Sequence, residues 1–170
     1  MAEGASKEAD LRVAFVYKFM KFIEWPNQAA EAALKLCVLG ADADAKEALR
    51  PLNGQPVSRQ IVDGNFVIKQ TIETIYLDDA AAIAQNLKSC HMLYRPAHSL
   101  PLTIPQPLPV GVLMVADDPV PSETNVGIAL ARSDDGRIEF SISIAAANHA
   151  GVSISSQLLK LAKNSQGGRQ

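Results

Sequence analysis

The sequence predicts an α/β fold: a single-domain mixed sheet of the Rossmann-like or flavodoxin-like kind, with helices on both faces, a C-terminal antiparallel hairpin and a closing helix. Three observations lead to this prediction. The 170 residues suit one domain. Short apolar runs alternate with segments of helical periodicity, and NVGIALARSDDGRIEFSISI holds two alternating runs around a turn. We expect a flexible segment over 1–6, the domain over 7–163 and a disordered tail over 164–170.

The first predicted element is a helix in DLRVAFVYKFMKFIEWP, with Ser6 as its N-cap and Pro26 at its end. Its apolar residues cover an arc of about 180°, wider than the roughly 100° that a surface helix needs. Two interpretations fit this width: a helix wedged between the sheet and loops, or a helix that also contacts a second copy of the chain. In the second interpretation Val13, Val16 and Met20 form the dimer contact.

The middle of the chain alternates between predicted strands and helices. ALKLCVLG is typical of a buried strand, and either Asp42 or Asp44 can cap a helix through DAKEALRPL. VSRQIV and NFVIKQTIETIYL are separated by Asp63 and Gly64, which predicts either a hairpin or one strand with a bulge. Asp78 begins a helix through AAAIAQNLK, and SCHMLYR returns as a strand.

The last third of the chain begins with SLPLTIPQPLP, whose four prolines predict an extended connection. VGVLMVAD follows as a buried strand. The predicted hairpin turns at 134–136 and places Ser141 and Ser143 on the face opposite its apolar residues. A turn at Gly151 then leads to a closing helix in ISSQLLKLAK, capped by Ser155.

Composition narrows the classes of partner. The formal net charge of −2 lacks the basic excess that nucleic acid binding rewards, so we expect no nucleic acid partner. No apolar run approaches the roughly 18 residues of a membrane span, and we expect no direct membrane insertion. MAEGASKEAD has no apolar core of a secretory signal, and we expect that a native signal peptide is absent from this sequence.

A hydrolase is one candidate function, because His149 lies near Ser153, Ser155 and Ser156, and a nucleophilic serine needs an adjacent imidazole. The sequence has no G-x-S-x-G elbow to hold a serine on a strained turn. Helix capping and turn formation already explain these serines, so we predict no catalytic residue here.

Acidic residues follow two predicted strands: Asp42 and Asp44 after the first, Asp117 and Asp118 after VLMVA. Carboxyl ends of strands in α/β sheets meet at one edge, where such a group can hold a divalent cation or accept a phosphoryl group. Capping by Asp44 and a turn at Asp117 explain the same residues. We favour these structural roles.

Patterns for cofactors and metals are also missing. LGADADA has neither G-x-G-x-x-G nor the Walker pattern, which argues against nucleotide binding. His91 and His98 have no Cys or His partner at ligand spacing, so we predict no metal site. The residues alone therefore indicate a binding or regulatory module without a cofactor.

Four stretches of the chain occur in the order and spacing of the YfiR-like proteins, which the chain resembles. They are AFVYKFMKFIEWP, LKLCVLG, SCHMLYR and GRIEFSISIAAANHAGVSISSQLLKLAK. The resemblance spans nearly the whole chain. Its most specific parts are the aromatic helix ending in EWP and the closing pattern of strand, Ala-Gly-Val and helix.

The resemblance implies a non-enzymatic, dimeric regulator in the periplasm. Such a protein binds the periplasmic region of a membrane-anchored diguanylate cyclase and represses it, which lowers cyclic di-GMP signalling and biofilm formation. The resemblance also implies a second partner, an OmpA-like outer-membrane lipoprotein that captures the repressor.

At the level of residues, the resemblance implies a disulfide between Cys37 and Cys90. It also places a partner surface on the hairpin and the closing region. The residues expected on this surface are Ser141, Ser143, Asn148, His149 and Gln157.

The chain departs from the family pattern in three places. It has no cysteines left for the second disulfide that some relatives carry near the final hairpin, SLPLTIPQPLP replaces a more regular helical connection, and NVGIAL lacks the expected glycine pair.

The alternative function is a periplasmic small-ligand sensor. An α/β domain of this kind also resembles one lobe of a periplasmic binding protein, whose ligand lies at the carboxyl ends of the strands.

Overall fold

The computed structural model describes residues 2–26, 33–123, 125–163 and 165–166. The helices are α1 (Ala2–Phe22), α2 (Ala43–Leu49), α3 (Ala80–Asn86), α4 (Ile144–Ala150) and α5 (Ser156–Leu161), with single 3₁₀ turns η2 (Arg50–Leu52) and η3 (Leu87–Ser89). The strands are β1 (Ile23–Glu24), β2 (Ala33–Leu39), β3 (Pro56–Val62), β4 (Asn65–Leu77), β5 (Met92–Arg95), β6 (Leu113–Asp117), β7 (Ile128–Arg132), β8 (Ile138–Ser143), β9 (Ser153–Ile154) and β10 (Ser165–Gln166).

One mixed sheet organises the described part of the chain, in the order β10-β8-β7-β6-β5-β2-β4-β3. Its centre is a parallel block, β4-β2-β5-β6-β7, whose order relative to the sequence is that of flavodoxin-like sheets. β3 is antiparallel to β4 and β8 is antiparallel to β7, so the predicted C-terminal hairpin is confirmed as β7 and β8. The predicted mixed α/β sheet is therefore confirmed.

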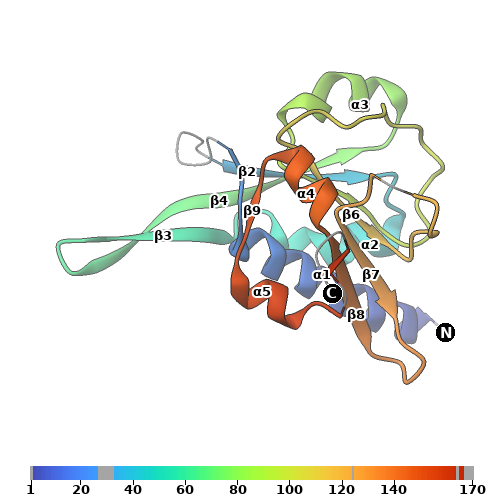
Figure 1. Ribbon diagram of the computed structural model, residues 1–170, viewed down its shortest axis with the longest axis horizontal. Coiled ribbons are helices and arrows are strands. Elements are labelled where there is room, and N and C mark those ends of the chain that lie inside the picture. The colour runs from blue at the N-terminus through green and yellow to red at the C-terminus, as the bar shows by residue number, and fades with distance from the viewer. Residues whose placement is uncertain (1, 27–32, 124, 164, 167–170) are drawn as a thin grey trace.

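The stretch around Asp63 and Gly64, for which the sequence left two interpretations, forms a hairpin. Both residues have a positive φ, 53° and 81°, as the tight turn between two antiparallel strands requires. Only the second half of β4, from Thr71 onward, pairs with β2. The first half pairs with β3 alone, and this two-stranded ribbon extends beyond the rest of the sheet (Figure 1).

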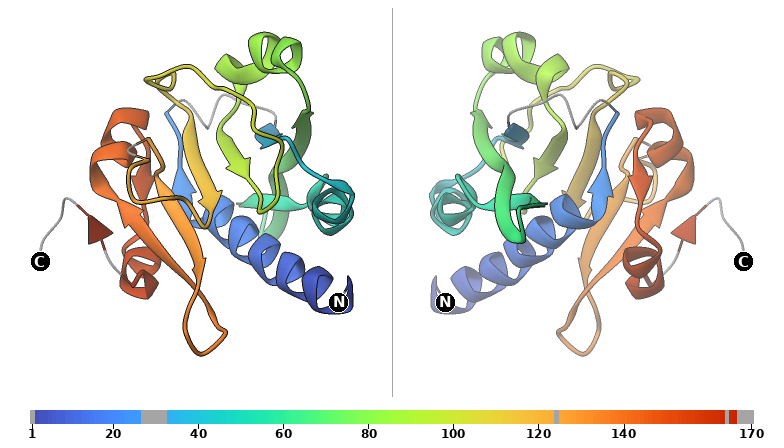
Figure 2. Two further views of the ribbon diagram at one scale, coloured as in Figure 1. Left: turned by 90° about the vertical axis from the view of Figure 1, so that its right-hand side faces the viewer. Right: turned by 90° about the vertical axis from the view of Figure 1, so that its left-hand side faces the viewer.

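Helices pack on both faces of the sheet. One core layer contains apolar residues of α1, α2 and α5 with one face of the strands. The other contains residues of α3 and of the proline-rich segment 96–112 with the opposite face. Figure 2 shows α1 and α3 on opposite sides of the sheet. Alternation of side chains along the strands supplies apolar residues to both layers.

Helix α1 begins at Ala2, before the predicted cap Ser6, and ends at Phe22. Ile23 and Glu24, which follow the helix, pair antiparallel with β9. The helix therefore ends before Trp25, the residue whose backbone conformation Pro26 restricts.

The three residues predicted to contact a second copy lie inside the core. Val13, Val16 and Met20 are 8%, 0% and 1% exposed, and they pack in the same layer as the sheet residues. The wide apolar arc is therefore covered by the chain's own sheet and neighbouring helices. This burial removes Val13, Val16 and Met20 from the predicted dimer surface, while the dimer itself stays a prediction.

A short helix, α4, follows Ser143, where the sequence predicted only the end of the hairpin and a turn at Gly151. Its run of alanines has high helix propensity, and the hydroxyl of Ser143 accepts a hydrogen bond from the Ala146 N–H at 3.2 Å. Gly151, at φ 79°, ends α4 in the left-handed conformation. The turn predicted at Gly151 is confirmed, but it closes a helix.

The sequence left Asp42 and Asp44 open as the cap of α2, and the structure selects Asp42. Ser155 caps α5, as predicted. Asp79 rather than the adjacent Asp78 caps α3, with its carboxylate accepting from the Ala82 N–H at 2.8 Å. Of the expected tail 164–170, the structure describes Ser165 and Gln166, which lie parallel to β8; the rest lies outside the described residues, as does residue 1 of the expected flexible segment.

Candidate functional site

A hollow of the described chain lies at the carboxyl ends of the parallel strands, and we call it the carboxyl-edge cleft. Its volume is about 670 Å³, within the range of small-molecule sites. Residues after β2, after β5 and at the end of β6 line it, and the first half of α1 forms another wall. The strand order reverses between β2 and β5, so the cleft occupies the position where doubly wound sheets bind ligands.

A buried cation, Arg12, lies at the inner wall of this cleft. Although it sits on α1, it is only 2% exposed. Its guanidinium contacts carboxylates of Glu8 at 3.0 Å, Asp117 at 3.3 Å and Asp118 at 3.0 Å. These ion pairs connect the helix to the end of β6. A buried guanidinium needs such partners, because an unpaired charge in the interior is costly.

Asp117 is held from three directions. Its Oδ2 accepts hydrogen bonds from the Tyr94 hydroxyl and from the Ala97 N–H, both at 2.8 Å. Its Oδ1 accepts no hydrogen bond from the described residues and has only the ion pair with Arg12. Burial raises the pKa of Asp117, against the opposing effect of Arg12 and of these hydrogen bonds. Burial and the Asp117 charge raise the pKa of Tyr94 well above its usual value, so the phenol stays a donor.

The acidic residues predicted at the strand ends do not form a metal site. Asp42 accepts a hydrogen bond from the Ala45 N–H at 2.9 Å as the cap of α2, Asp44 is exposed, and Asp117 and Asp118 are paired with Arg12. Within the described residues, no group of three or more His, Cys, Asp or Glu side chains is placed to hold a metal ion.

The two histidines considered as metal ligands have other surroundings. Nδ1 of His91 accepts a hydrogen bond from the Lys35 N–H at 2.9 Å, and the His91 N–H donates back to the Lys35 carbonyl at 3.0 Å. His98 is exposed at the carboxyl-edge cleft, with a φ of 62° that non-glycine residues seldom adopt.

His149 and the nearby serines do not form a nucleophile and base pair in the described structure. Nε2 of His149 lies 2.8 Å from the carbonyl of Leu108, and it donates there because a carbonyl only accepts. Ser155 caps α5, with its hydroxyl accepting from the Gln157 N–H at 3.1 Å. Ser153 belongs to β9 and Ser156 begins α5.

The five residues predicted to bind a partner fall into separate groups. Ser141 is half-buried on the face of β8 opposite Phe140, and Ser143 caps α4. Asn148 and His149 are exposed on α4. Gln157 is exposed on α5, which packs in the core layer of α1, and that layer lies across the sheet from Ser141. The structure therefore brings Asn148 and His149 together and separates them from Gln157.

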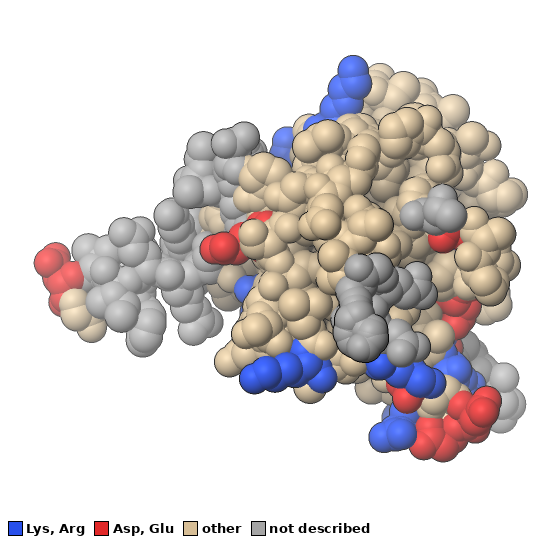
Figure 3. All heavy atoms as spheres, viewed as in Figure 1, with Lys and Arg blue, Asp and Glu red and all other residues tan. Residues whose placement is uncertain are grey.

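Asn148 and His149 lie where two stretches without charged residues come together, and we call this surface the α4 face. Neither 96–116 nor 140–159 contains a Lys, Arg, Asp or Glu residue. Val110, which is 70% exposed, lies at the end of α4, where the Gly111 N–H donates to the Ala150 carbonyl at 2.9 Å. In Figure 3 the charged side chains lie mainly at the periphery, away from the position of α4.

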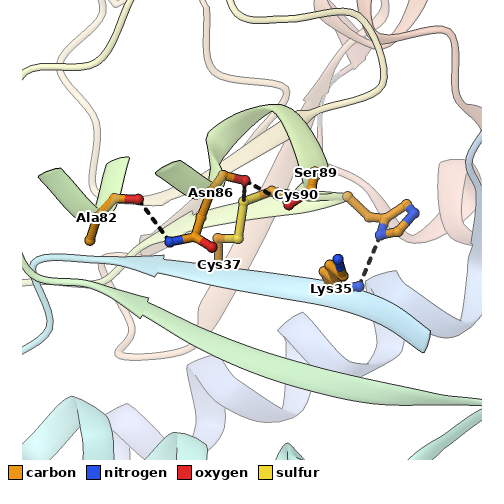
Figure 4. The surroundings of a disulfide bond; sticks show 7 residues. Lys35, Cys37, Ala82, Asn86, Ser89 and Cys90 are labelled. Atoms are coloured by element: carbon orange, nitrogen blue, oxygen red, sulfur yellow. Dashed lines mark hydrogen bonds between the residues drawn. A yellow bond between two sulfur atoms is a disulfide. The ribbon is translucent and has the colours of Figure 1, made fainter. Parts of the chain in front are cut away.

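The disulfide between Cys37 and Cys90 is present, as the resemblance implied. It joins β2 to the residue after η3, with 5.9 Å between the Cα atoms, and both cysteines are buried. Figure 4 shows the bond beneath α3, where the Asn86 side chain donates to the Ala82 carbonyl at 2.9 Å. The disulfide therefore fixes the second core layer to the central strand.

Arg12 is the site residue that the sequence analysis missed. A signal for it exists, because Arg12, Val16, Phe19 and Ile23 share one helical stripe, and the last three are apolar and buried. A charged residue that continues such a stripe indicates a buried partner of opposite charge.

A family model described as YfiR/HmsC-like matches residues 9–163, and no curated protein matches the chain. No described helix has both the length and the apolar character required for a membrane span.

Proposed function

Because the chain belongs to the YfiR/HmsC-like family, a family of periplasmic regulatory proteins, we propose that it binds and represses the periplasmic region of a membrane-anchored diguanylate cyclase. Repression lowers cyclic di-GMP signalling and biofilm formation, and the chain itself has no catalytic role. The disulfide between Cys37 and Cys90 supports a periplasmic location, because such bonds persist in oxidising compartments.

The observation that supports a partner-binding role is the α4 face. Charged residues are depleted at the centres of protein interfaces, because their desolvation is costly. The α4 face has no charge over two long stretches of sequence, and it exposes Val110 beside Asn148 and His149. We place the cyclase contact there, with Ser141 and Ser143 at its border and Gln157 outside it.

The first experiment identifies the partner. The purified chain is used to capture membrane proteins from the source cell, and mass spectrometry then identifies the captured proteins. We expect a membrane protein with a periplasmic region and a cytoplasmic diguanylate cyclase domain. Failure to recover such a protein with folded chain would contradict the proposed function.

A pair of substitutions then tests the α4 face. Val110→Asp places an uncompensated charge in the proposed contact, and we expect binding to the cyclase's periplasmic region to weaken at least about tenfold. Val120→Asp is the matched control, because Val120 is 57% exposed and follows the other end of β6. Equal affinity of the two variants, measured by calorimetry, would remove the α4 face from the interface.

The remaining assignments are proposals of the same kind. An OmpA-like outer-membrane lipoprotein releases the cyclase by capturing this chain, and the chain forms a homodimer. Since Val13, Val16 and Met20 are buried, the dimer uses other residues. Sedimentation at high protein concentration tests the dimer, and a single monomeric species would exclude it.

A second candidate function is a small-ligand sensor. One observation favours it: the carboxyl-edge cleft, which lies at the switch point of the sheet. A ligand that binds only the native state raises the melting temperature by mass action, so thermal unfolding across a set of small metabolites is its test. The two functions are compatible, because the two surfaces lie at opposite ends of the parallel strands. The α4 face is at their amino ends, and the cleft is at their carboxyl ends.

A further inference from the structure

We propose that the carboxyl-edge cleft binds a small organic cation: an amine that carries an apolar chain or ring. This inference deepens the second candidate function and does not depend on binding to a cyclase. It follows from the charges around the cleft, from its apolar walls and from the fixed position of the loop after β5.

The side chains at and beside the cleft carry an excess of negative charge. The basic residues that line it are Lys7, Arg12 and Arg132, and the acidic ones are Glu8, Asp42, Asp44 and Asp117, while Asp118 beside the cleft pairs with Arg12. Three basic groups thus face four carboxylates in the lining, which favours a cation over an anion.

The guanidinium groups of the cleft are already occupied. Arg12 is buried against Glu8, Asp117 and Asp118. Arg132 contacts Glu8 at 3.2 Å. An anionic ligand that binds either guanidinium would have to displace a carboxylate, and for Arg12 that would leave a buried charge uncompensated.

Asp44 is the carboxylate best placed to receive an ammonium group. It is exposed at the cleft and makes no ion pair or side-chain hydrogen bond with the described residues. Among the described residues, the neighbouring Asp42 accepts only from the Ala45 N–H, so its second carboxylate oxygen is available to a ligand donor.

The walls near these carboxylates are largely apolar. Val13, Leu49 and Pro96 are buried side chains that line the cleft, and Leu11 lines it while remaining 53% exposed. A ligand with an apolar chain or ring would remove this surface from water, whereas a bare metal ion would not. This combination selects an organic amine.

The loop that forms one side of the cleft is held in place before any ligand arrives. The Leu100 N–H donates to the Gly40 carbonyl at 2.9 Å. Gly40 has a φ of 60°, and a Cβ there would lie 2.8 Å from the Leu100 nitrogen, so the two loops approach as closely as glycine permits. Pro96 and His98 therefore occupy fixed positions, which reduces the ordering cost of binding.

Two probes of matched shape and opposite charge test the proposal. Phenethylamine and 3-phenylpropionate have similar apolar bodies, and they are titrated into the isolated chain by calorimetry at low ionic strength. We expect phenethylamine to bind roughly tenfold more tightly than the acid, and its affinity to fall as salt is added. Equal or tighter binding of the acid, or no heat from either probe, would overturn the proposal.

A substitution locates the binding site. Asp44→Asn keeps the shape of the side chain and removes its charge, and we expect phenethylamine affinity to fall roughly two- to fivefold. Asp63→Asn is the control, because Asp63 is exposed at the tip of the β3–β4 hairpin and asparagine tolerates its positive φ. Equal effects of the two substitutions would place the amine elsewhere. Because no cyclase is present, these results are independent of the repression experiment.

Discussion

Replacement of Arg12 by methionine tests whether the buried ion pair holds α1 to the sheet. Methionine preserves most of the apolar stem of the side chain, so the change removes mainly the charge. Asp117, whose side chain is 2% exposed, then loses the cation at 3.3 Å. An uncompensated carboxylate in the interior destabilises the folded state far more than the loss of a surface pair.

The structure sets the size of the effect. Removal of one partner from a buried pair costs about 3–5 kcal/mol. Asp117 keeps its hydrogen bonds from Tyr94 and Ala97, so we expect the lower end, about 3 kcal/mol. For a chain of this length the melting temperature should fall by roughly 6–12 °C.

Denaturant unfolding of both this variant and Arg132→Met measures the difference. Arg132 also pairs with Glu8, but its side chain is 63% exposed, and the same substitution should cost less than about 1 kcal/mol. If Arg12→Met cost no more than Arg132→Met, the ion pair would not be a determinant of stability.

We also expect the stability cost of Arg12→Met to depend on pH. The pKa of Asp117 is raised in the folded state, so this group favours folding most at low pH, and its contribution falls as pH rises above its ordinary value of 3.8. Loss of Arg12 removes an interaction that lowers this pKa, so the pKa rises further. The cost of Arg12→Met should therefore be largest near neutral pH and shrink as pH falls toward 4. A cost independent of pH would exclude Asp117 as the affected group.

Two further predictions concern the core. Removal of the disulfide by replacing Cys37 and Cys90 with alanine should lower the unfolding free energy by about 4 kcal/mol, because the bond closes a long loop in the unfolded chain. Denaturation with and without reductant measures this, and reductant should leave the variant unchanged. Phe19→Ala should cost about 3–5 kcal/mol, since Phe19 is fully buried. Leu11→Ala on the same helix should cost less than about 0.5 kcal/mol, and comparable losses would contradict the assigned burial.

The candidate site could be predicted from the sequence only in part. Asp117 follows a recognisable buried strand, so its place at the carboxyl edge follows from the α/β pattern. Its partner Arg12 is more than a hundred residues away, and no local pattern connects the two. The α4 face depends likewise on contacts between distant segments: His149 meets the Leu108 carbonyl only because the proline-rich segment packs beside α4.

The sequence by itself determined the mixed α/β class, the β7–β8 hairpin and the cap at Ser155, because each depends on residue type and local period. Tertiary structure alone decided which faces are covered. The sequence left open whether Val13, Val16 and Met20 also contact a second copy, and it did not predict the helix α4. Burial depends on what packs against a face, and that neighbour can lie anywhere along the chain.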